Sequence, residues 1–343
     1  MKRVVLVVGG AGYIGSHMLV ALRDSGFAPV VFDNLSRGHR DATGDSPLFT
    51  GDLRRRSDIK NCLQQTKFDV IFHFAALAYV GESVVDPESY YQHNVLGTLN
   101  LLAAMREHGP NRLVFSSTCA TYGEPKTIPI TEDHLQLPIN PYGRSKLMIE
   151  GILRDYGEAY GLRSVSLRYF NAAGCDPLGR AGERHEPETH LIPLVLNECL
   201  RVRNGGNPEE TQLQVFGLDF DTSDGSCIRD YIHVTDLCQA HLLAAERLMI
   251  ESPAIPNSPT AEFYNLSNAR GVSVLNIITE CERVSKVQVK YKIMPKRAGD
   301  PSILVGSSDL ASSILGWQPK FQELRAIIET AWDWAVKRDS MDL

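Results

Sequence analysis

The fold of this 343-residue chain is decided near its amino terminus, in the stretch Val4-Val5-Leu6-Val7-Val8-Gly9-Gly10-Ala11-Gly12-Tyr13-Ile14-Gly15. The five apolar residues predict a buried strand, and the glycine-rich turn then opens a segment with helical periodicity. Between a strand and a helix, glycines permit a tight turn and let backbone N–H groups approach a pyrophosphate. The stretch therefore predicts a dinucleotide-binding unit.

Short apolar runs and amphipathic segments alternate through the first half of the chain. Strands are predicted at 4–8, 29–32, 70–74, 112–116 and 164–169, and helices at 14–25, 57–65, 91–108 and 141–160. This alternation is typical of an α/β fold with a Rossmann-type, doubly wound parallel sheet. After Asn171 the chain becomes rich in Gly, Pro and charge as far as Pro187, which indicates an exit into a smaller unit.

We therefore predict an NAD-binding domain over residues 1–172 and a smaller, discontinuous α/β substrate domain over 173–230 and 269–343. The chain is expected to return to the first domain at about 231–268, with a helix at 231–249 and a strand at 262–266.

Composition argues against several classes of protein. The net charge of −6 offers no basic field for nucleic acid. Seven scattered cysteines, never spaced as C-x-x-C, suggest neither disulfides nor zinc and favour a reducing cytoplasm. No apolar run approaches the roughly 18 residues that span a bilayer. The ten histidines form no H-E-x-x-H motif, so a metal hydrolase is disfavoured and no metal site is predicted.

Asp33 ends the second predicted strand, where a carboxylate can accept hydrogen bonds from adenosine ribose hydroxyls and repel a 2′-phosphate. This position predicts NAD rather than NADP as the cofactor. Arg37 and Arg40 lie nearby and could instead favour a phosphate. The segment Gly51-Asp52-Leu53 could position the adenine or form only a turn.

The segment Tyr142-Gly-Arg-Ser-Lys146 predicts a proton-transfer pair, because residues four apart share a helix face. The Lys146 ammonium can then favour the ionised form of the Tyr142 phenol. A base working near neutrality needs about 4 kcal/mol of such help, since the ordinary pKa of tyrosine is about 10. A partly buried ammonium together with an oxidised nicotinamide could supply it. Ser116-Ser117-Thr118 ends a strand, so its hydroxyls are expected to join this array.

The chain resembles the extended short-chain dehydrogenase/reductases and, within them, the UDP-glucose 4-epimerases, because several motifs occur in the same order and at corresponding positions. The matching stretches cover nearly the whole chain: 9–17, 33–35, 73–76, 80–83, 94–98, 115–123, 142–146, 168–171 and 229–233. The resemblance implies that Tyr142 removes the proton of the sugar 4-hydroxyl while hydride passes from C4 to tightly held NAD. It further implies a 4-keto sugar that turns over and takes the hydride back, with Thr118 at the 4-oxygen and Lys146 at the nicotinamide ribose.

Motifs and resemblance together name the expected site residues. Cofactor binding is assigned to Gly9, Gly12, Tyr13, Ile14, Gly15, Asp33, Asn34, Ser36, Asp52, Leu53, Phe74, Ala75, Ala76, Asn94, Ser116, Tyr142, Lys146 and Phe170. Substrate binding is assigned to Thr118, Tyr142, Asn171, His190, Leu191, Arg229, Arg297, Asp300 and Leu304. The planar forks of the two arginines suit a diphosphate. For Asn94 and Ser116, ordinary hydrogen bonding to the backbone is the alternative.

The resemblance leaves the substrate open. Cys119 and Ala120 stand where family dehydratases and decarboxylases carry a carboxylate, so elimination lacks its acid. Leu304 occupies a position that is Tyr in members restricted to the unacetylated sugar and smaller in those that accept N-acetyl sugars. Leucine at this position leaves the range of substrates open. By the overall resemblance UDP-galactose/UDP-glucose is the leading substrate pair, with UDP-xylose/UDP-arabinose, UDP-GlcNAc/UDP-GalNAc and UDP-glucuronate as alternatives. Ala78 replaces a lysine that some members place near the cofactor, so NAD is expected to be held less tightly than in those enzymes.

Two further expectations concern assembly and catalysis. The resemblance implies a homodimer built from the 91–108 and 141–160 helices, although the sheet alone could cover their apolar stripes. A dinucleotide-sensing protein without catalysis is the alternative of a different class. The intact Thr118, Tyr142 and Lys146 weigh against it.

Overall fold

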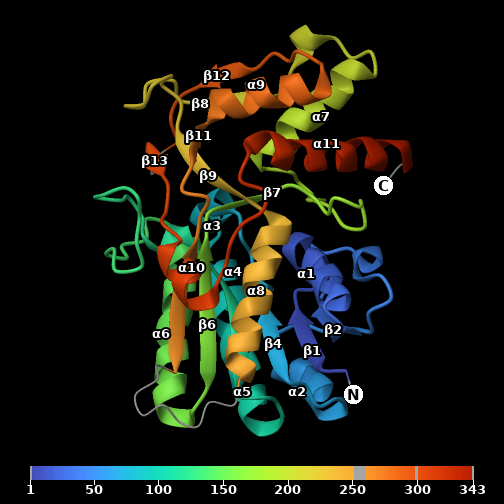
Figure 1. The fold of residues 1–343 in the computed structure, drawn as a ribbon, viewed down its shortest axis with the longest axis vertical. Coiled ribbons are helices and arrows are strands. Elements are labelled where there is room, and N and C mark those ends of the chain that lie inside the picture. Colours follow the sequence, from blue (N-terminus) through green and yellow to red (C-terminus); the bar gives the residue numbers. More distant parts are fainter. Residues whose placement is uncertain (1, 251–259, 298–299, 342–343) are drawn as a thin grey trace.

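The structure is a computed structural model that describes residues 2–250, 260–297 and 300–341. Figure 1 shows a larger unit, in which helices flank a central sheet, below a smaller unit that carries the last helix. The main sheet has seven parallel strands in the order β10-β6-β5-β4-β1-β2-β3. These strands are β1 (Val4–Val8), β2 (Ala28–Asp33), β3 (Leu48–Thr50), β4 (Val70–His73), β5 (Arg112–Thr118), β6 (Arg163–Tyr169) and β10 (Ala261–Leu266). The predicted Rossmann-type sheet is confirmed.

Helices cover both faces of this sheet, which explains why its strands are apolar without alternation. Successive residues of a strand point to opposite faces. Val5 and Val7 of β1 pack toward α1 and α8, whereas Leu6 and Val8 pack toward α2, α5 and α6. The bounds of these helices are α1 (Tyr13–Asp24), α2 (Arg56–Gln65), α5 (Gly97–His108), α6 (Pro141–Tyr160) and α8 (Val234–Met249). Short helices complete the unit: η1 (Arg40–Thr43), α3 (Val80–Val85), α4 (Pro87–Tyr90), η2 (Tyr91–Leu96), η3 (Cys119–Thr121) and α10 (Asp309–Leu315).

The order of the strands reverses at β1, because β2 lies on one side of it and β4 on the other. In parallel sheets the crevice beyond such a reversal is where ligands bind. The segments that leave β1 and β4 meet there, because the Phe74 and Ala75 N–H groups both donate to the Val8 carbonyl, at 2.8 and 3.0 Å.

The second unit joins a small sheet to three helices. Its strands are β7 (Asn171–Ala173), β9 (Ile228–His233), β11 (Gly271–Ser273) and β13 (Ile303–Leu304), with a separate pair of β8 (Gln214–Phe216) and β12 (Lys292–Met294). Its helices are α7 (Leu191–Arg203), α9 (Val274–Ser285) and α11 (Leu324–Met341), with the short turn η4 (Pro208–Glu210). One core joins the three helices, with Leu196, Ile278 and Ile328 buried in it. This unit overhangs the carboxyl ends of the main strands (Figure 1).

Two predicted elements differ in extent. The helix expected at 231–249 begins only at Val234, because Tyr231, Ile232 and His233 end β9 and pair with Asn171, Ala172 and Ala173 of β7. The partner strand is distant in sequence, so periodicity could not reveal it. The helix expected at 91–108 starts with a π-helical segment over Tyr91–Leu96 and becomes α-helical at Gly97.

The contacts differ from the proposed division into domains in two places. Tyr231–His233 lie in a strand of the second unit, whereas α10, from the carboxyl-terminal part of the chain, packs on α8 and β10 of the first. Among the helices of the described ranges, none combines the length and hydropathy required to cross a bilayer.

Candidate active site

A cavity of about 1540 Å³ runs along the carboxyl ends of the main strands, under the second unit. Every residue expected to bind cofactor or substrate lines it, with the exception of Asn94. The volume exceeds the roughly 300–1,000 Å³ of most single-ligand sites, so two nucleotides have room side by side.

The glycine turn shapes one wall of the cavity. Gly9 has φ of +84°, and a Cβ atom there would lie 2.4 Å from the Ala75 nitrogen. A Cβ atom on Gly15 would lie 2.1 Å from the Gly9 carbonyl oxygen. Neither position therefore accepts a side chain. The cap residue of α1 is Gly12, and no side chain of the described residues caps this end, so the first-turn N–H groups point toward the cavity.

Asp33 fixes the loop that follows β2. Its carboxylate accepts hydrogen bonds from the Ala11 N–H at 3.0 Å and the Leu35 N–H at 2.8 Å. Burial raises its pKa, although the backbone hydrogen bonds act in the opposite direction. Arg37, the possible phosphate ligand, instead pairs with Glu82 at 2.6 Å. A carboxylate at the ribose position and a neutralised arginine both favour NAD over NADP.

A second carboxylate, that of Asp52, fixes the loop expected to position the adenine. The Arg54 guanidinium is 2.6 Å from Asp52 and, with its backbone N–H, lowers the pKa of Asp52 strongly. Asn34 donates to Asp52 at 3.4 Å and accepts from the Ser36 N–H at 3.0 Å. Asp52 therefore stays ionised within a connected loop.

Thr118, Tyr142 and Lys146 meet at the centre of the cavity. Thr118 ends β5, and Tyr142 lies in the first turn of α6, whose cap Asn140 accepts from the Gly143 N–H at 2.8 Å. The Lys146 ammonium donates to the Ser116 carbonyl at 2.8 Å and lies 6.0 Å from the centre of the Tyr142 ring. One strand end and one helix start thus bring a hydroxyl, a phenol and an ammonium together.

The Tyr142 phenol is not activated by the protein alone. Burial raises its pKa well above the ordinary value and Tyr169 adds to this, while the hydrogen bond with Thr118 acts in the opposite direction. The Lys146 ammonium, whose nitrogen lies 6.0 Å from the centre of the ring, does not offset this rise. The expectation from the sequence combined this ammonium with an oxidised nicotinamide. A further positive charge near the phenol, such as that of an oxidised nicotinamide, would lower the pKa of Tyr142.

Lys146 itself is buried, and this affects stability. Burial lowers its pKa from 10.5 to about 7, although Glu150 raises it. The unfolded chain therefore binds the additional proton between about pH 7 and 10.5, so the contribution of this lysine to stability rises with pH in that interval. We therefore expect the free energy of unfolding of the wild type to increase relative to that of Lys146→Met as the pH rises from about 7 to 9. Urea unfolding of both proteins along this pH series checks it, and parallel curves would contradict it.

Two residues expected at the cofactor have other partners. Asn94 is buried beside the cavity, where its side chain exchanges hydrogen bonds with the Leu77 backbone at 2.9 and 3.0 Å and donates to Ser145 at 3.0 Å. It therefore positions the loop after β4. The Ser116 hydroxyl lines the cavity and is hydrogen-bonded to the Tyr169 hydroxyl.

The second unit forms the opposite wall with the expected substrate residues. Asn171, His190, Leu191, Arg229, Arg297, Asp300 and Leu304 all line the cavity. Arg229 donates to Asp300 at 3.0 Å, and the Arg297 guanidinium lies 3.9 Å from the centre of the Phe216 ring. Leu304 packs against the apolar group formed by Cys119, Tyr122, Ile130 and Phe170.

An ion pair is buried one helical turn beyond Lys146. Arg168 of β6 donates to both oxygens of Glu150 of α6, at 2.9 and 2.7 Å, and both side chains are buried. Ser117 and Tyr122 complete this network, donating to Glu150 at 2.6 Å and accepting from Arg168 at 2.8 Å, respectively. The network joins α6 to β5 and β6 of the sheet, one helical turn beyond Lys146.

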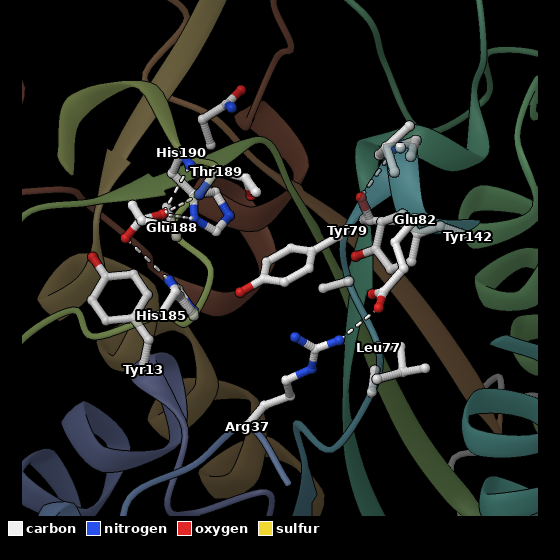
Figure 2. A pocket seen from close by; sticks show the side chains of 18 of the residues that line it. Tyr13, Arg37, Leu77, Tyr79, Glu82, Tyr142, His185, Glu188, Thr189 and His190 are labelled. Carbon is white, nitrogen blue, oxygen red and sulfur yellow. Dashed lines mark hydrogen bonds and ion pairs between the residues drawn. The ribbon is translucent and has the colours of Figure 1, made fainter. Parts of the chain in front are cut away.

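Of the residues between the two walls, His190 was expected at the substrate, whereas Tyr79, Glu183, His185 and Glu188 were not among the predicted site residues. In Figure 2 the Tyr79 ring points into the space between Tyr142 and a cluster of His185, Glu188 and His190. The cluster also contains Glu183 and follows the pattern E-x-H-x-x-E-x-H. That spacing fits no helical face, and only the folded loop brings the four side chains together.

Comparison with known proteins agrees with this geometry. Residues 5–254 match the model of the NAD dependent epimerase/dehydratase family. A UDP-glucose 4-epimerase of Rhizobium leguminosarum bv. trifolii is 48% identical over 97% of each chain. The structure is similar to that of a Brucella ovis UDP-glucose 4-epimerase in complex with NAD, with a TM-score of 0.89, 44% identity and coverage of 97% of this chain and 99% of the other. It is also similar to a UDP-Glc/GlcNAc 4-epimerase of Campylobacter jejuni, with a TM-score of 0.80, 39% identity and coverage of 98% and 100%. The chain therefore belongs to the NAD dependent epimerase/dehydratase family and, within it, to the UDP-glucose 4-epimerases.

Proposed function

We propose that this protein interconverts UDP-galactose and UDP-glucose by transient oxidation at sugar C4, with NAD as a tightly bound cofactor. The observation that carries the proposal is the placement of Thr118, Tyr142 and Lys146 between a glycine turn and a wall with two arginines, in one cavity. A pure sensor has no use for such an array. A relative named UDP-glucose 4-epimerase, 48% identical over 97% of each chain, supports the proposal.

The residues of the first wall fit NAD. The N–H groups at the start of α1, which has no side-chain cap at Gly12 and lines the cavity, suit a pyrophosphate, and Asp33 suits the adenosine ribose. Lys146 and Phe170 would hold the nicotinamide half. When bound, NAD accepts a hydride from the sugar and returns it, and its oxidised ring supplies the positive charge that Tyr142 needs.

The proton is handled by side chains of the protein. We assign Tyr142 as the group that takes the proton of the sugar 4-hydroxyl and later returns it, because a phenol can act as both base and acid. Thr118 holds the 4-oxygen and, through its hydrogen bond, favours the phenolate. The pyrophosphate of the substrate is assigned to Arg229 and Arg297, whose forks pair with phosphate oxygens.

The same residues argue against elimination. The Cys119 thiol is buried, which raises its pKa to about 12, and Ala120 has no acid. A 4-keto sugar formed here therefore has no nearby acid to expel a neighbouring hydroxyl. The reaction that remains is return of the hydride to the opposite face of C4 after the sugar has turned.

The test is incubation of the purified protein with UDP-galactose and no added cofactor. Chromatography of the nucleotide sugars is combined with the absorbance of bound dinucleotide. Formation of UDP-glucose without net NADH is expected. Turnover of UDP-xylose or an N-acetyl nucleotide sugar alone would keep the mechanism and change the substrate, whereas inactivity on all of them would favour the sensor.

The choice of cofactor depends on Asp33. In Asp33→Asn we expect NAD affinity to fall about 10- to 100-fold, the cost of losing a hydrogen bond to a charged group, while NADP binding improves relative to NAD. Titration of both cofactors into protein depleted of dinucleotide measures this. Asp45→Asn, at an exposed position of the same unit, is the matched control. Wild-type protein that binds NADP as tightly as NAD would contradict the assignment.

We also propose a cytoplasmic homodimer. All seven cysteines are free and buried, as in proteins of a reducing compartment. Leu96 at the end of η2 and Met148 on α6 are 44% and 48% exposed, and both lie on the segments expected to form the interface. Light scattering after gel filtration tests the dimer, which a monomeric mass at micromolar concentration would contradict.

A further inference from the structure

Four side chains of the loop between β7 and α7 converge on one point. They are Glu183, His185, Glu188 and His190, and one nitrogen or oxygen atom of each lies within 4.8 Å of those of the other three. Within the described ranges, this is the group of side chains close enough together to bind a metal ion. Figure 2 shows three of them, His185, Glu188 and His190, facing one another across the gap from Tyr79. Nothing in the proposed epimerase chemistry uses this group as a unit.

Four imidazole-to-carboxylate separations lie near the edge length of a metal-centred tetrahedron, with His190 nearest Oε1 and His185 nearest Oε2 of Glu188. Zinc binds imidazole nitrogen and carboxylate oxygen at about 2.0–2.2 Å, so tetrahedral ligand atoms lie about 3.3 Å apart. His190 Nδ1 is 2.9 Å from a Glu188 oxygen and 3.2 Å from Glu183 Oε1. His185 Nδ1 is 3.1 Å from Glu183 Oε1 and 3.6 Å from Glu188 Oε2. Each imidazole thus faces both carboxylates at about the expected edge length.

The burial of His185 gives a further indication. Its Nδ1 atom is buried and makes no hydrogen bond of good geometry in the described part of the chain, although Glu183 Oε1 lies 3.1 Å away and Glu188 Oε2 3.6 Å away. A buried polar atom without a partner is costly unless it meets a ligand. The surroundings fix the ring, since the rings of Tyr13 and Tyr79 lie edge-on, each at 6.0 Å from it.

Backbone hydrogen bonds also orient the carboxylate of Glu188. One Glu188 oxygen accepts from the Thr189 and His190 N–H groups, each at 2.8 Å, which holds the carboxylate toward the imidazoles. Two neutral imidazoles and two carboxylates leave two negative charges, which one divalent cation cancels. Secondary contacts that orient ligands are typical of metal sites.

An ion could reach this group from two cavities, and its binding would affect the loop between β7 and α7. His185 and Glu188 line both the large cavity and a second cavity of about 510 Å³ that opens between α7 and α11. The Tyr13 hydroxyl of the glycine turn donates to the Gly174 carbonyl at 2.6 Å, at the start of the same loop. A bound ion would therefore fix the loop that joins the two walls of the active cavity.

We propose that Glu183, His185, Glu188 and His190 bind one Zn²⁺ ion in a closed, four-coordinate structural site. The proposal does not depend on the epimerase activity. In it, His190 acts as a metal ligand, in place of the substrate contact that the family resemblance implies.

The competing account is a network of ion pairs without metal. Burial alone would lower the pKa of His185, but Glu183 and Glu188 outweigh it and raise the pKa to about 9, so a protonated imidazole could also balance the carboxylates. The two accounts differ in bound zinc, which can be measured directly.

The experiment uses full-length protein without a histidine tag. Zinc is counted by plasma mass spectrometry after dialysis against metal-free buffer, and affinity is measured by competition with a chromogenic chelator. We expect one zinc per chain in the wild type. In His185→Gln the zinc affinity should fall by at least about 100-fold, because loss of a residue that only orients a ligand already costs up to about 100-fold. Thermal unfolding and dinucleotide content establish that the variant is folded.

His108→Gln is the matched control, because His108 also lies beside a carboxylate, 3.7 Å from Glu107, but far from the loop in sequence. Zinc retained in this control and lost in both His185→Gln and Glu183→Gln supports the site. Wild-type protein without saturable zinc binding overturns it and favours the ion-pair network. Equal zinc binding by His185→Gln and the wild type also overturns it, because the ion then binds elsewhere. None of these readouts requires turnover, so loss of the proposed function would be seen separately.

Discussion

Replacing Tyr142 by phenylalanine is expected to lower kcat for UDP-galactose by about 10²–10⁴-fold, the usual contribution of a positioned acid–base group. Only the phenol oxygen is removed, so the buried ring, which meets Tyr90 edge-on at 6.4 Å, keeps its packing. Initial rates of UDP-glucose formation measure the loss. Bound dinucleotide should remain, because the glycine turn and Asp33 are unchanged.

Tyr156→Phe is the control for this variant, since it makes the same change on the same helix and Tyr156 packs outside the cavity. Its turnover is expected to stay within about twofold of the wild type, as for most substitutions away from a site. Turnover of Tyr142→Phe within that same range would contradict the assigned proton transfer.

The second large effect is expected on stability. In Arg168→Met the Glu150 carboxylate stays buried without its cation, which typically costs about 3–5 kcal/mol. Replacing both partners by apolar residues of similar size, Arg168→Met with Glu150→Leu, should cost much less, because no buried charge is left without a partner. Urea unfolding of the wild type, of the single variants Arg168→Met and Glu150→Leu, and of the double variant gives the comparison.

Two results would contradict this account of the ion pair. The first is a loss of less than about 1 kcal/mol in Arg168→Met, which would place the pair in the class of exposed salt bridges. The second is a double variant as unstable as the sum of its single variants, because contacting residues are expected to couple.

The first wall of the site was predictable because its signals are local. Gly9 and Gly15 need the absence of a Cβ atom for reasons set within one turn, and Asp33 ends the strand that precedes its loop. The position of Thr118 follows from the end of β5, and that of Tyr142 from the start of α6. Each of these needs only one strand or helix to be placed correctly.

The second unit was less predictable because its strands pair over long distances. β7, β11 and β13 have two or three residues each and are defined by their pairing with β9. Such short runs show no periodicity of their own. The boundary of the helix at Val234 was misplaced for this reason.

Electrostatics and side-chain direction also required the fold. Spacing placed Lys146 near Tyr142, but burial and the Ser116 carbonyl determine where the ammonium goes. A motif could not show that the Asn94 amide faces Leu77 rather than the cavity. The group around His185 becomes visible only when its loop folds back on itself.

The central claim is that hydrogen leaves C4 as hydride and returns to the same carbon. The most direct measurement follows UDP-galactose deuterated at C4, turned over in ordinary water without added cofactor, with NMR and mass spectrometry of the UDP-glucose formed. The account predicts that the product keeps essentially all of its deuterium at C4. Loss of deuterium to the solvent would contradict it, because the carbon would then exchange a proton with water.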